Sequence, residues 1–371
     1  MKRKILSLLA LSLVAVFTLT ACAPPATGSS QASTTTESSS QETSAKKTVV
    51  RVGTQPIMVG TPLDYALKNN MFDDTSLEIE RILFPTGAPI NEAFAAEQID
   101  IALNGLATVY AVAAGDVTWV GEINIASGMS VYVRPDSPIA AENPGFENAP
   151  DVRGSAETIT GIQILGPLGN AEHYNASTWA EMFGLTPQDY EILHMDRGPA
   201  TQAFLAGEGD AIAAHPPYTY QLEDEGMINV GPIGQTSGTN LTDGIAVRND
   251  YLEDNRDIVV EFLKVIYEAQ EILANDPEVA YEACMDYYTE NGKEYSEEEV
   301  RKEVKERYFI GKDYFSAEGY ELGSVIYGMG EFYVEDGKID PSLYDNIPDG
   351  IDSSLISEVY GIDINVASPN K

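Results

Sequence analysis

The fold of this chain is decided by residues 82–110, ILFPTGAPINEAFAAEQIDIALNGLATVY, because part of this stretch recurs as residues 192–220, ILHMDRGPATQAFLAGEGDAIAAHPPYTY. Each copy reads as a strand, a helix opened by Pro, and an Asp that opens the next strand. Pro is tolerated there because the first N–H groups of a helix have no partner within it. Any two strand–helix–strand units look somewhat alike, but the register favours a duplicated lobe. The identities 110 positions apart are Ile82/Ile192, Leu83/Leu193, Pro89/Pro199, Ala93/Ala203, Phe94/Phe204, Ala96/Ala206, Asp100/Asp210 and Tyr110/Tyr220.

Strand and helix patterns alternate on both sides of these copies. Such alternation predicts an α/β fold, with mixed, mostly parallel sheets and helices on their faces. The expected strands are 49–53, 77–84, 99–103, 159–165, 190–195 and 211–214. The expected helices are 61–70, 88–96, 106–114, 170–183, 199–206 and 217–225, followed by a helical C-terminal part with helices at 250–274, 277–290, 296–308 and 317–332.

The length of the chain and its duplication predict two lobes. A single core stops growing at roughly 250 to 300 residues, and the folded part exceeds 300 residues. We expect residues 49–134 and 241–371 to form lobe 1 and residues 135–240 to form lobe 2. The segments Ala126–Arg134 and Asp243–Val247 are expected to cross between the lobes as hinge strands.

The N-terminus has the pattern of a bacterial lipoprotein. Residues 1–21 combine a basic start with a short apolar run, which is typical of a secretory signal peptide. A membrane helix is the weaker interpretation, because spanning a bilayer takes roughly 20 apolar residues. The sequence Leu19-Thr20-Ala21-Cys22 predicts lipidation of Cys22, with a plain secreted chain as the alternative. Residues 22–48 are rich in Ser, Thr and Gln and are interpreted as a disordered tether, so we expect an extracytoplasmic protein anchored to the cell membrane.

The charge of the chain excludes one class of partner. It has 22 basic and 58 acidic residues, a net charge of −36. Such a field repels nucleic acid phosphates, so no nucleic-acid role is expected. Cys22 and Cys284 are the only cysteines, so lipidation of Cys22 leaves none for a disulfide within the chain. Cys284 is interpreted as a small core residue.

Two duplicated α/β lobes imply a cleft between them. In open α/β sheets, ligands bind outside the carboxyl ends of the strands. This rule names the loops that should face the cleft, which are Thr54–Gly60, Asn104–Thr108, Gly166–His173, Met195–Gly198 and His215–Tyr218.

Signatures of chemistry are sparse, so neither an enzyme nor a cofactor is expected. The sequence lacks the nucleophile elbow, the zinc-protease motif, the Walker loop and the dinucleotide motif. His173, His194 and His215 are too far apart in sequence to fix a metal site, and none is expected. The loop Gly166–Gly169 precedes a helix, whose N-terminus favours anions, although a simple turn explains it equally well. Asp100 and Asp210 are interpreted as structural turns or caps.

At these loops, from about Val50 to Asp250, the sequence resembles the solute-binding lipoproteins of ABC importers for aliphatic sulfonates, taurine and nitrate. The pieces that match are Arg51–Gln55, Gly87–Pro89, Ala93-Phe94, Asp100, Gly105, His173-Tyr174, Met182–Leu185, Pro187, Phe204–Ala211 and Pro217. The resemblance implies the two-lobed periplasmic-binding-protein type II fold, in which the lobes close over a small molecule. It also implies an ABC permease as partner, and we expect a monomer.

The resemblance, together with the loops expected to face the cleft, predicts a set of ligand-binding residues. They are Gln55, Asn104, Gly105, Leu106, Gly128, Met129, Gly169, Asn170, Glu172, His173, His215 and Tyr218. Glu172 departs from the family pattern, since it would place negative charge where an anion prefers to bind. A pyrimidine-type vitamin precursor or an amine is therefore the alternative to an oxyanion. An enzyme on the same fold and a sensory lipoprotein remain the alternatives to an importer receptor.

Overall fold

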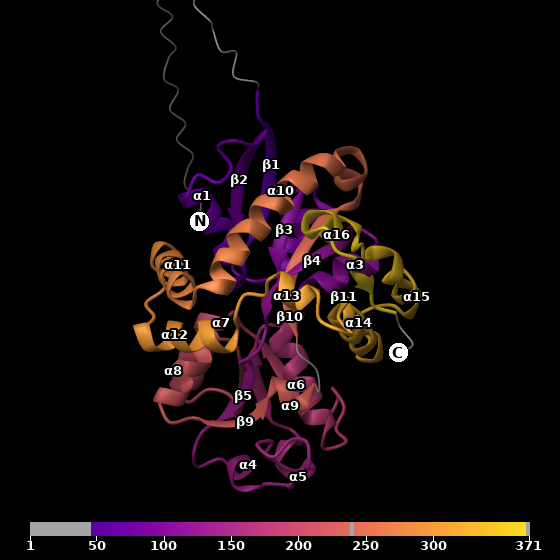
Figure 1. Cartoon of the computed structure of the whole chain (residues 1–371). Coiled ribbons are helices and arrows are strands. Elements are labelled where there is room, and N and C mark those ends of the chain that lie inside the picture. Colours follow the sequence, from indigo (N-terminus) through magenta and orange to yellow (C-terminus); the bar gives the residue numbers. More distant parts are fainter. Residues whose placement is uncertain (1–45, 238–240, 369–371) are drawn as a thin grey trace, which may run out of the picture. The chain divides into compact units, whose positions relative to one another are not determined.

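The computed structural model describes residues 46–237 and 241–368. The predicted signal peptide, Cys22 and most of the predicted tether lie outside these residues. The described chain forms two five-stranded sheets and one short two-stranded sheet, with helices around them (Figure 1). This architecture confirms the predicted α/β class.

In each large sheet four strands run in the same direction, and one, the fourth in the spatial order given next, runs antiparallel to its two neighbours. In spatial order, the first sheet consists of β2 (Leu77–Leu83), β1 (Thr48–Thr54), β3 (Ile101–Asn104), β10 (Thr242–Arg248) and β4 (Val117–Ile125). The second consists of β7 (Glu191–His194), β6 (Gln163–Gly166), β8 (Ala211–Ala214), β5 (Ser130–Val133) and β9 (Ile228–Pro232). The short sheet pairs β11 (Glu321–Leu322) with β12 (Asn365–Val366).

The two large sheets share one topology, as the duplicated sequence predicts. β1 pairs in parallel with β2 and β3, and β6 pairs in parallel with β7 and β8. An antiparallel strand follows in each sheet, β10 beside β3 and β5 beside β8. β3 and β8 lie 110 residues apart, which is the spacing of the repeat.

The duplicated aspartates do the same structural work in both sheets. Oδ2 of Asp100 accepts a hydrogen bond from the backbone N–H of Arg51 at 2.9 Å, and Oδ2 of Asp210 accepts one from that of Gln163 at 2.9 Å. In return, the backbone N–H of Asp100 donates to the carbonyl of Arg51, and that of Asp210 donates to the carbonyl of Gln163, both at 2.8 Å. Each aspartate therefore ties the start of one strand to its parallel neighbour.

The helices of the repeats lie between the strands as predicted, and a set of C-terminal helices follows. Those of the repeats are α1 (Thr61–Lys68), α2 (Ala88–Ala95), η2 (Leu106–Thr108), α3 (Val109–Ala114), α6 (Ala171–Glu181), α7 (Arg197–Leu205) and α8 (Tyr218–Asp224). The C-terminal ones include α10 (Asn249–Asn275), α11 (Pro277–Glu290), α12 (Glu297–Glu306), α14 (Ser324–Glu335) and α16 (Ser354–Tyr360). Short helices also occur at η1 (Met58–Gly60), α4 (Pro138–Ala141), α5 (Ala156–Ile159), α9 (Ile233–Thr236), α13 (Lys312–Phe315), α15 (Pro341–Tyr344) and η3 (Pro348–Gly350).

The C-terminal helices complete the core of the first sheet. α10 packs against α1, α11 and α16 and touches β10 and β4 (Figure 1). Trp119 of β4 and Cys284 of α11 are both fully buried in this core, which agrees with the interpretation of Cys284 as a core residue. The second sheet has separate smaller cores on its two faces, one around Trp179 of α6 and one around Phe204 of α7.

Several predicted elements are corrected by the structure. The strand predicted at 159–165 is only β6, because residues 156–159 form α5, which Ser155 and Thr158 close with reciprocal capping hydrogen bonds. The helix predicted at 317–332 begins at Ser324. β4 and β9 were missed in the sequence analysis. Every residue of β4 is buried, including the polar Thr118, Glu122 and Asn124.

The crossing segments are also corrected. Residues 126–129 link β4 of the first sheet to β5 of the second, so the chain does cross there. The prediction that Asp243–Val247 crosses is wrong, because these residues pair with β3 and β4 within the first sheet. Residue 134, the predicted end of the first segment of lobe 1, follows β5 of the second sheet, and the bounds of the lobes stay a prediction.

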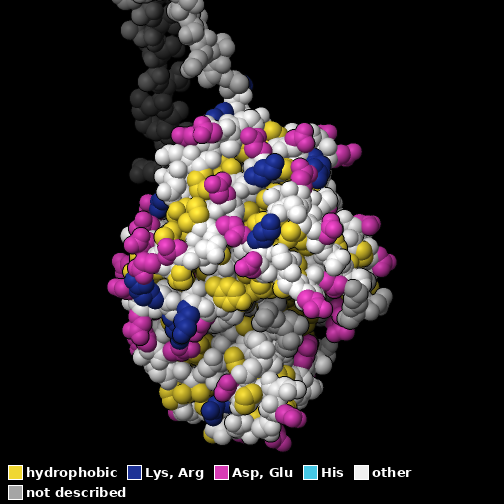
Figure 2. Space-filling model, in the orientation of Figure 1, with side chains coloured by type: hydrophobic (Ala, Val, Ile, Leu, Met, Phe, Trp, Pro, Cys, Tyr) yellow, Lys and Arg dark blue, Asp and Glu magenta, His cyan; other side chains and the backbone are white. Residues whose placement is uncertain are grey.

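Acidic side chains outnumber basic ones on the face shown in Figure 2, as the net charge of −36 requires. Within residues 46–237 and 241–368, no helix is long and apolar enough to cross a membrane.

Candidate functional site

A small buried cavity lies where strand ends of the two large sheets meet. Its volume is only about 10 Å³, roughly the room that one water molecule needs. The residues that line it are Gln55, Ile57, Gly87, Asn104, Gly105, Leu106, Ala107, Met129, Asn170, Ala171, Arg197, His215 and Asp243. Gln55 follows β1 and Asn104 ends β3, while His215 follows β8 of the second sheet. The cavity is therefore built from the carboxyl ends of strands in both repeats.

Arg197, the first residue of α7, connects the two sides of the cavity. Its Nε and Nη2 donate to the two carboxylate oxygens of Glu172 in α6, the second contact at 3.4 Å. Its Nη1 donates to Oε1 of Gln55 at 3.1 Å. Glu172 is fully buried and the side chain of Arg197 is 10% exposed. A buried charge is tolerated only with such a partner, so the pair holds the arginine in place against Gln55.

Gln55 links Arg197 to Asn104. Its Nε2 donates to Oδ1 of Asn104 at 2.8 Å, and the same oxygen accepts the backbone N–H of Gly105 at 2.8 Å. The carbonyl of Gln55 accepts a hydrogen bond from the Tyr287 hydroxyl at 2.8 Å, which fixes the loop after β1. The polar wall on this side is thus rigidly connected from α7 to β3.

A second buried arginine lies behind Asp243. Nη2 of Arg307 donates to Oδ2 of Asp243 at 2.7 Å, and its Nη1 donates to Oε1 of Glu303 at 3.3 Å. Asn124 donates to the same Asp243 oxygen at 2.9 Å. Burial raises the pKa of Glu303 above its usual value. With Arg197 and Glu172, the two arginines face three carboxyl groups, so no positive charge is left over at the site.

His215 is neutral in this arrangement. Its Nδ1 lies 2.6 Å from the carbonyl of Pro216, to which it can only donate, and its Nε2 lies 3.0 Å from Nη1 of Arg307. Burial lowers the pKa of His215 well below its usual value, and the charges of Arg307 and Arg197 lower it further. The imidazole therefore accepts from Arg307 through Nε2 and carries its proton on Nδ1.

Asn170 holds the remaining side of the cavity. Its Oδ1 accepts the backbone N–H of Gly87 at 3.2 Å, and its carbonyl accepts the hydroxyl of Tyr333 in α14 at 3.0 Å. A side chain at position 87 would bring its Cβ within 2.8 Å of Oδ1 of Asn104. Gly87 is therefore needed for the two asparagines to approach the same turn.

The structure brings seven of the twelve predicted site residues to this cavity. They are Gln55, Asn104, Gly105, Leu106, Met129, Asn170 and His215. The other five lie off its wall. Gly128 lines a separate surface hollow beside Glu306, and Gly169 lies against Tyr110. His173 packs on Tyr333 and lies 3.6 Å from Asp336, and Tyr218 packs on Tyr295.

The fifth residue, Glu172, requires a correction of the reasoning about charge. The sequence suggested that its carboxylate would repel an anion in the cleft. In the structure the carboxylate is bound by Arg197 and does not line the cavity. Its negative charge is therefore offset by a guanidinium that does line the cavity.

Arg197 and Asp243 are the polar residues that the sequence analysis did not single out. Arg197 lies in a loop that was expected to face the cleft, Met195–Gly198, and a lone basic residue there in so acidic a chain was the available signal. Asp243 was assigned to a crossing segment. Its position at the cavity follows from the pairing of Gly244 with Asn104, which the sequence does not reveal.

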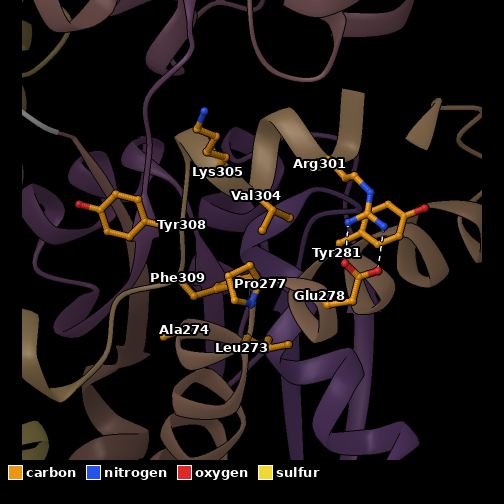
Figure 3. A pocket seen from close by; sticks show the side chains of 10 residues that line it. All are labelled: Leu273, Ala274, Pro277, Glu278, Tyr281, Arg301, Val304, Lys305, Tyr308 and Phe309. Atoms are coloured by element: carbon orange, nitrogen blue, oxygen red, sulfur yellow. Dashed lines mark hydrogen bonds and ion pairs between the residues drawn. The ribbon is translucent and has the colours of Figure 1, made fainter. Parts of the chain in front are cut away.

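A larger hollow lies on the surface between α10, α11 and α12, with a volume of about 390 Å³ (Figure 3). Arg301 bridges its edge, donating to both oxygens of Glu278 at 2.7 and 2.8 Å and lying 3.8 Å from the centre of the Tyr281 ring. Most of its other lining residues are apolar, and none comes from a strand end. We therefore place the functional site at the small cavity.

Comparisons with known proteins identify relatives of this chain. A protein of Brachyspira hyodysenteriae named as an ABC transporter periplasmic binding protein is 27% identical over 317 residues, covering 85% of this chain and 91% of that protein. The taurine-binding periplasmic protein of Escherichia coli is 26% identical over 183 residues, covering 47% of this chain and 57% of its own length.

Among solved structures, the alkanesulfonate-binding protein of Xanthomonas axonopodis pv. citri bound to MOPS superposes with a TM-score of 0.63 at 16% identity. The superposition covers 84% of this chain and 100% of the alkanesulfonate-binding protein. At this identity the likeness establishes the periplasmic-binding-protein fold. The profile of the NMT1-like family matches residues 43–285, nearly two thirds of the sequence. The chain therefore belongs to the NMT1-like family.

Proposed function

We propose that this protein is the extracytoplasmic receptor of an ABC importer, which captures a small organic solute in the cavity between its two sheets. The observation that carries the proposal is the contact of Arg197 with Gln55, which joins the start of α7 to the loop after β1 across the cavity. The names of the relatives, one an ABC transporter binding protein and one a taurine-binding protein, support the same class.

The geometry suits capture by closure. Two-lobed binding proteins commonly close around a ligand by a hinge motion of their lobes. A solute that fits between the strand ends would bind the closed state better than the open one and so shift the population toward it. The cavity of about 10 Å³ is then the closed state with its wall residues in mutual contact, and a solute would replace some of those contacts with its own.

We propose that the protein works outside the cytoplasm, held to the membrane by lipid on Cys22, and delivers its solute to an ABC permease. The lipoprotein pattern at Leu19–Cys22 supports the anchor. No catalytic step is proposed. The ionisable side chains at the cavity are held in ion pairs or by neutral hydrogen bonds, which suits binding.

The charge balance bears on the solute. Arg197 and Arg307 are each offset by carboxyl groups, so the wall offers no surplus positive charge to a sulfonate or nitrate. This favours the neutral or amine-bearing alternative over the oxyanion.

A thermal-shift screen tests the proposal, since a ligand raises the melting temperature by mass action. The panel contains taurine, alkanesulfonates, nitrate, pyrimidines, amines and amides. The matched variant is Gly105→Val, because a Cβ there would lie 3.0 Å from Oδ1 of Asp243 at the cavity wall. The control is Gly234→Ala, where a Cβ meets no atom within 4 Å.

We expect at least one solute to raise the melting temperature of the wild type and of Gly234→Ala but not of Gly105→Val. Mass spectrometry should recover that solute unchanged. A panel without any hit, or a shift that survives Gly105→Val, would contradict the proposed site, and conversion of the solute would favour an enzyme.

A further inference from the structure

We infer that Asn104 presents an amide N–H to the solute, beside an acceptor supplied by Asp243, so that the site selects an uncharged amide or lactam edge over an oxyanion. This inference rests on the proposed function, because it assumes that the cavity binds a solute. It deepens that function by naming the chemical class that the wall recognises.

The orientation of Asn104 is fixed by donors on both of its neighbours. A guanidinium can only donate hydrogen bonds, so Gln55 must turn Oε1 toward Arg197 and Nε2 toward Asn104. Asn104 must then offer Oδ1. The backbone N–H of Gly105 is also only a donor and lies 2.8 Å from the same oxygen. Two independent donors therefore determine which atom of the Asn104 amide is the oxygen and which is the nitrogen.

This orientation leaves Nδ2 of Asn104 for the cavity. The side chain is fully buried and lines the cavity, and Nδ2 has no hydrogen-bond partner among the described residues. A buried donor without an acceptor is costly, so proteins satisfy nearly all of them. A solute oxygen or ring nitrogen would satisfy it.

An acceptor lies next to this donor. β10 and β3 pair antiparallel with Gly244 opposite Asn104, which places Asp243 opposite Gly105. Oδ1 of Asp243 lies 3.0 Å from the point where a Cβ of Gly105 would be, while Oδ2 is held by Arg307 and Asn124. The wall thus offers an N–H and a carboxylate oxygen side by side, and the complement is an acceptor beside an N–H.

An oxyanion matches this wall poorly. An oxyanion could accept a hydrogen bond from Nδ2 of Asn104. It has no N–H to donate to the carboxylate of Asp243, which would instead repel it. Arg197 also lines the cavity, but two of its three nitrogens donate to Glu172 and the third donates to Gln55. Like charges at close range disfavour binding, whereas an amide or lactam edge satisfies both groups without any net charge.

The test compares three probes built on one ring, which are benzamide, benzoate and benzenesulfonate, by calorimetry and thermal shift. Benzamide carries the acceptor and the N–H, and the other two carry only acceptors and a negative charge. We expect the wild type to bind benzamide at least tenfold more tightly than either anion.

The matched variant is Asn104→Asp, which replaces the N–H with an oxygen at nearly constant shape. We expect it to weaken benzamide roughly tenfold, as loss of a hydrogen bond to a buried group does, and to strengthen binding of benzamidinium. The control is the same change at Asn143, an exposed loop residue, which should alter nothing. The ranking in the wild type stands as evidence even if Asn104→Asp folds poorly.

Benzoate or benzenesulfonate binding as tightly as benzamide would overturn the inference, as would benzamide binding that Asn104→Asp leaves unchanged. If taurine or an alkanesulfonate binds at the cavity and benzamide does not, the inference fails while the receptor function stands. If no solute of the wider panel binds, the proposed function fails with it.

Discussion

Arg307 donates from Nη2 to Oδ2 of Asp243 at 2.7 Å, and the arginine side chain is completely buried. This contact ties the residue after α12 to the strand end that forms one wall of the cavity. It joins the C-terminal helices to the site, although they follow the two repeats in sequence. The pair therefore connects the stability of the fold to the shape of the cavity.

Replacing Arg307 by Met should destabilise the protein by about 3 to 5 kcal/mol, because loss of one partner leaves buried charge uncompensated. Asp243 and Glu303 would both lose their guanidinium. Urea unfolding followed by circular dichroism measures the change. The control is Arg301→Met at an exposed ion pair with Glu278, where a loss of at most about 1 kcal/mol is expected. Equal losses of unfolding free energy in the two variants would show that the buried ion pairs of Arg307 stabilise the protein no more than an exposed pair does.

The neutral state of His215 predicts a pH dependence of stability. The pKa of His215 is depressed in the folded protein, whereas in the unfolded chain it is near 6.5. As pH falls below 6.5, the unfolded state therefore binds a proton that the folded state does not. The stability is therefore fully present above about pH 6.5 and is lost as pH decreases. If the folded site stays unprotonated down to pH 5, the loss from pH 7 to 5 is about 2 kcal/mol.

His215→Gln isolates this contribution, because Gln cannot take up the proton. The difference in unfolding free energy between pH 7 and pH 5 should be about 2 kcal/mol smaller in the variant. Burial raises the pKa of Glu122 to about 7, which stabilises the folded state as pH falls, so only the difference between the two proteins is informative. Parallel pH curves for wild type and variant would contradict a neutral His215.

Replacing Glu172 by Gln should lower stability and raise affinity for anions at once. The change leaves Arg197 buried without its carboxylate, at a cost of about 3 kcal/mol or more. The freed positive charge lines the cavity and would then attract taurine or an alkanesulfonate. Calorimetry of both solutes against the wild type checks the affinity. If neither gains affinity while stability falls, Arg197 does not reach the solute.

Much of the fold could be predicted because it depends on local patterns. The repeat that includes Asp100 and Asp210 predicted two related units, and the structure gives both residues the same strand-tying hydrogen bonds. β4 was not predicted although Glu122-Ile123-Asn124-Ile125 alternates, and the structure buries its polar residues together with its apolar ones. Its existence depends on packing between distant segments.

The candidate site was predictable to the level of loops and less so to that of side chains. The rule that ligands bind at strand ends brought Gln55, Asn104 and His215 together correctly. It could not show that Arg197 would pair with Glu172, since residues 25 positions apart meet only when β6 pairs with β7 and brings the starts of α6 and α7 together. Local patterns predict which loops converge, and tertiary packing decides which charges cancel.

Gly244 gives a final prediction, because β10 can approach β4 closely only without a side chain there. A Cβ at this position would overlap the indole of Trp119 and the carbonyl of Gly121. Both neighbours are rigid, one a fully buried ring and the other backbone. Overpacking of this kind typically costs about 1 to 3 kcal/mol, occasionally more.

Gly244→Ala should therefore lower the urea midpoint and, since Gly244 adjoins Asp243, also weaken binding of any solute found in the screen. Gly328→Ala in α14 is the matched control, because its Cβ meets no atom within 4 Å and Ala is favoured over Gly in a helix by about 0.5 to 1 kcal/mol. The two substitutions should thus change stability in opposite directions. A midpoint unchanged by Gly244→Ala would mean that β10 can move away from Trp119 at no cost, and Asp243 would then not be held at the cavity by the sheet.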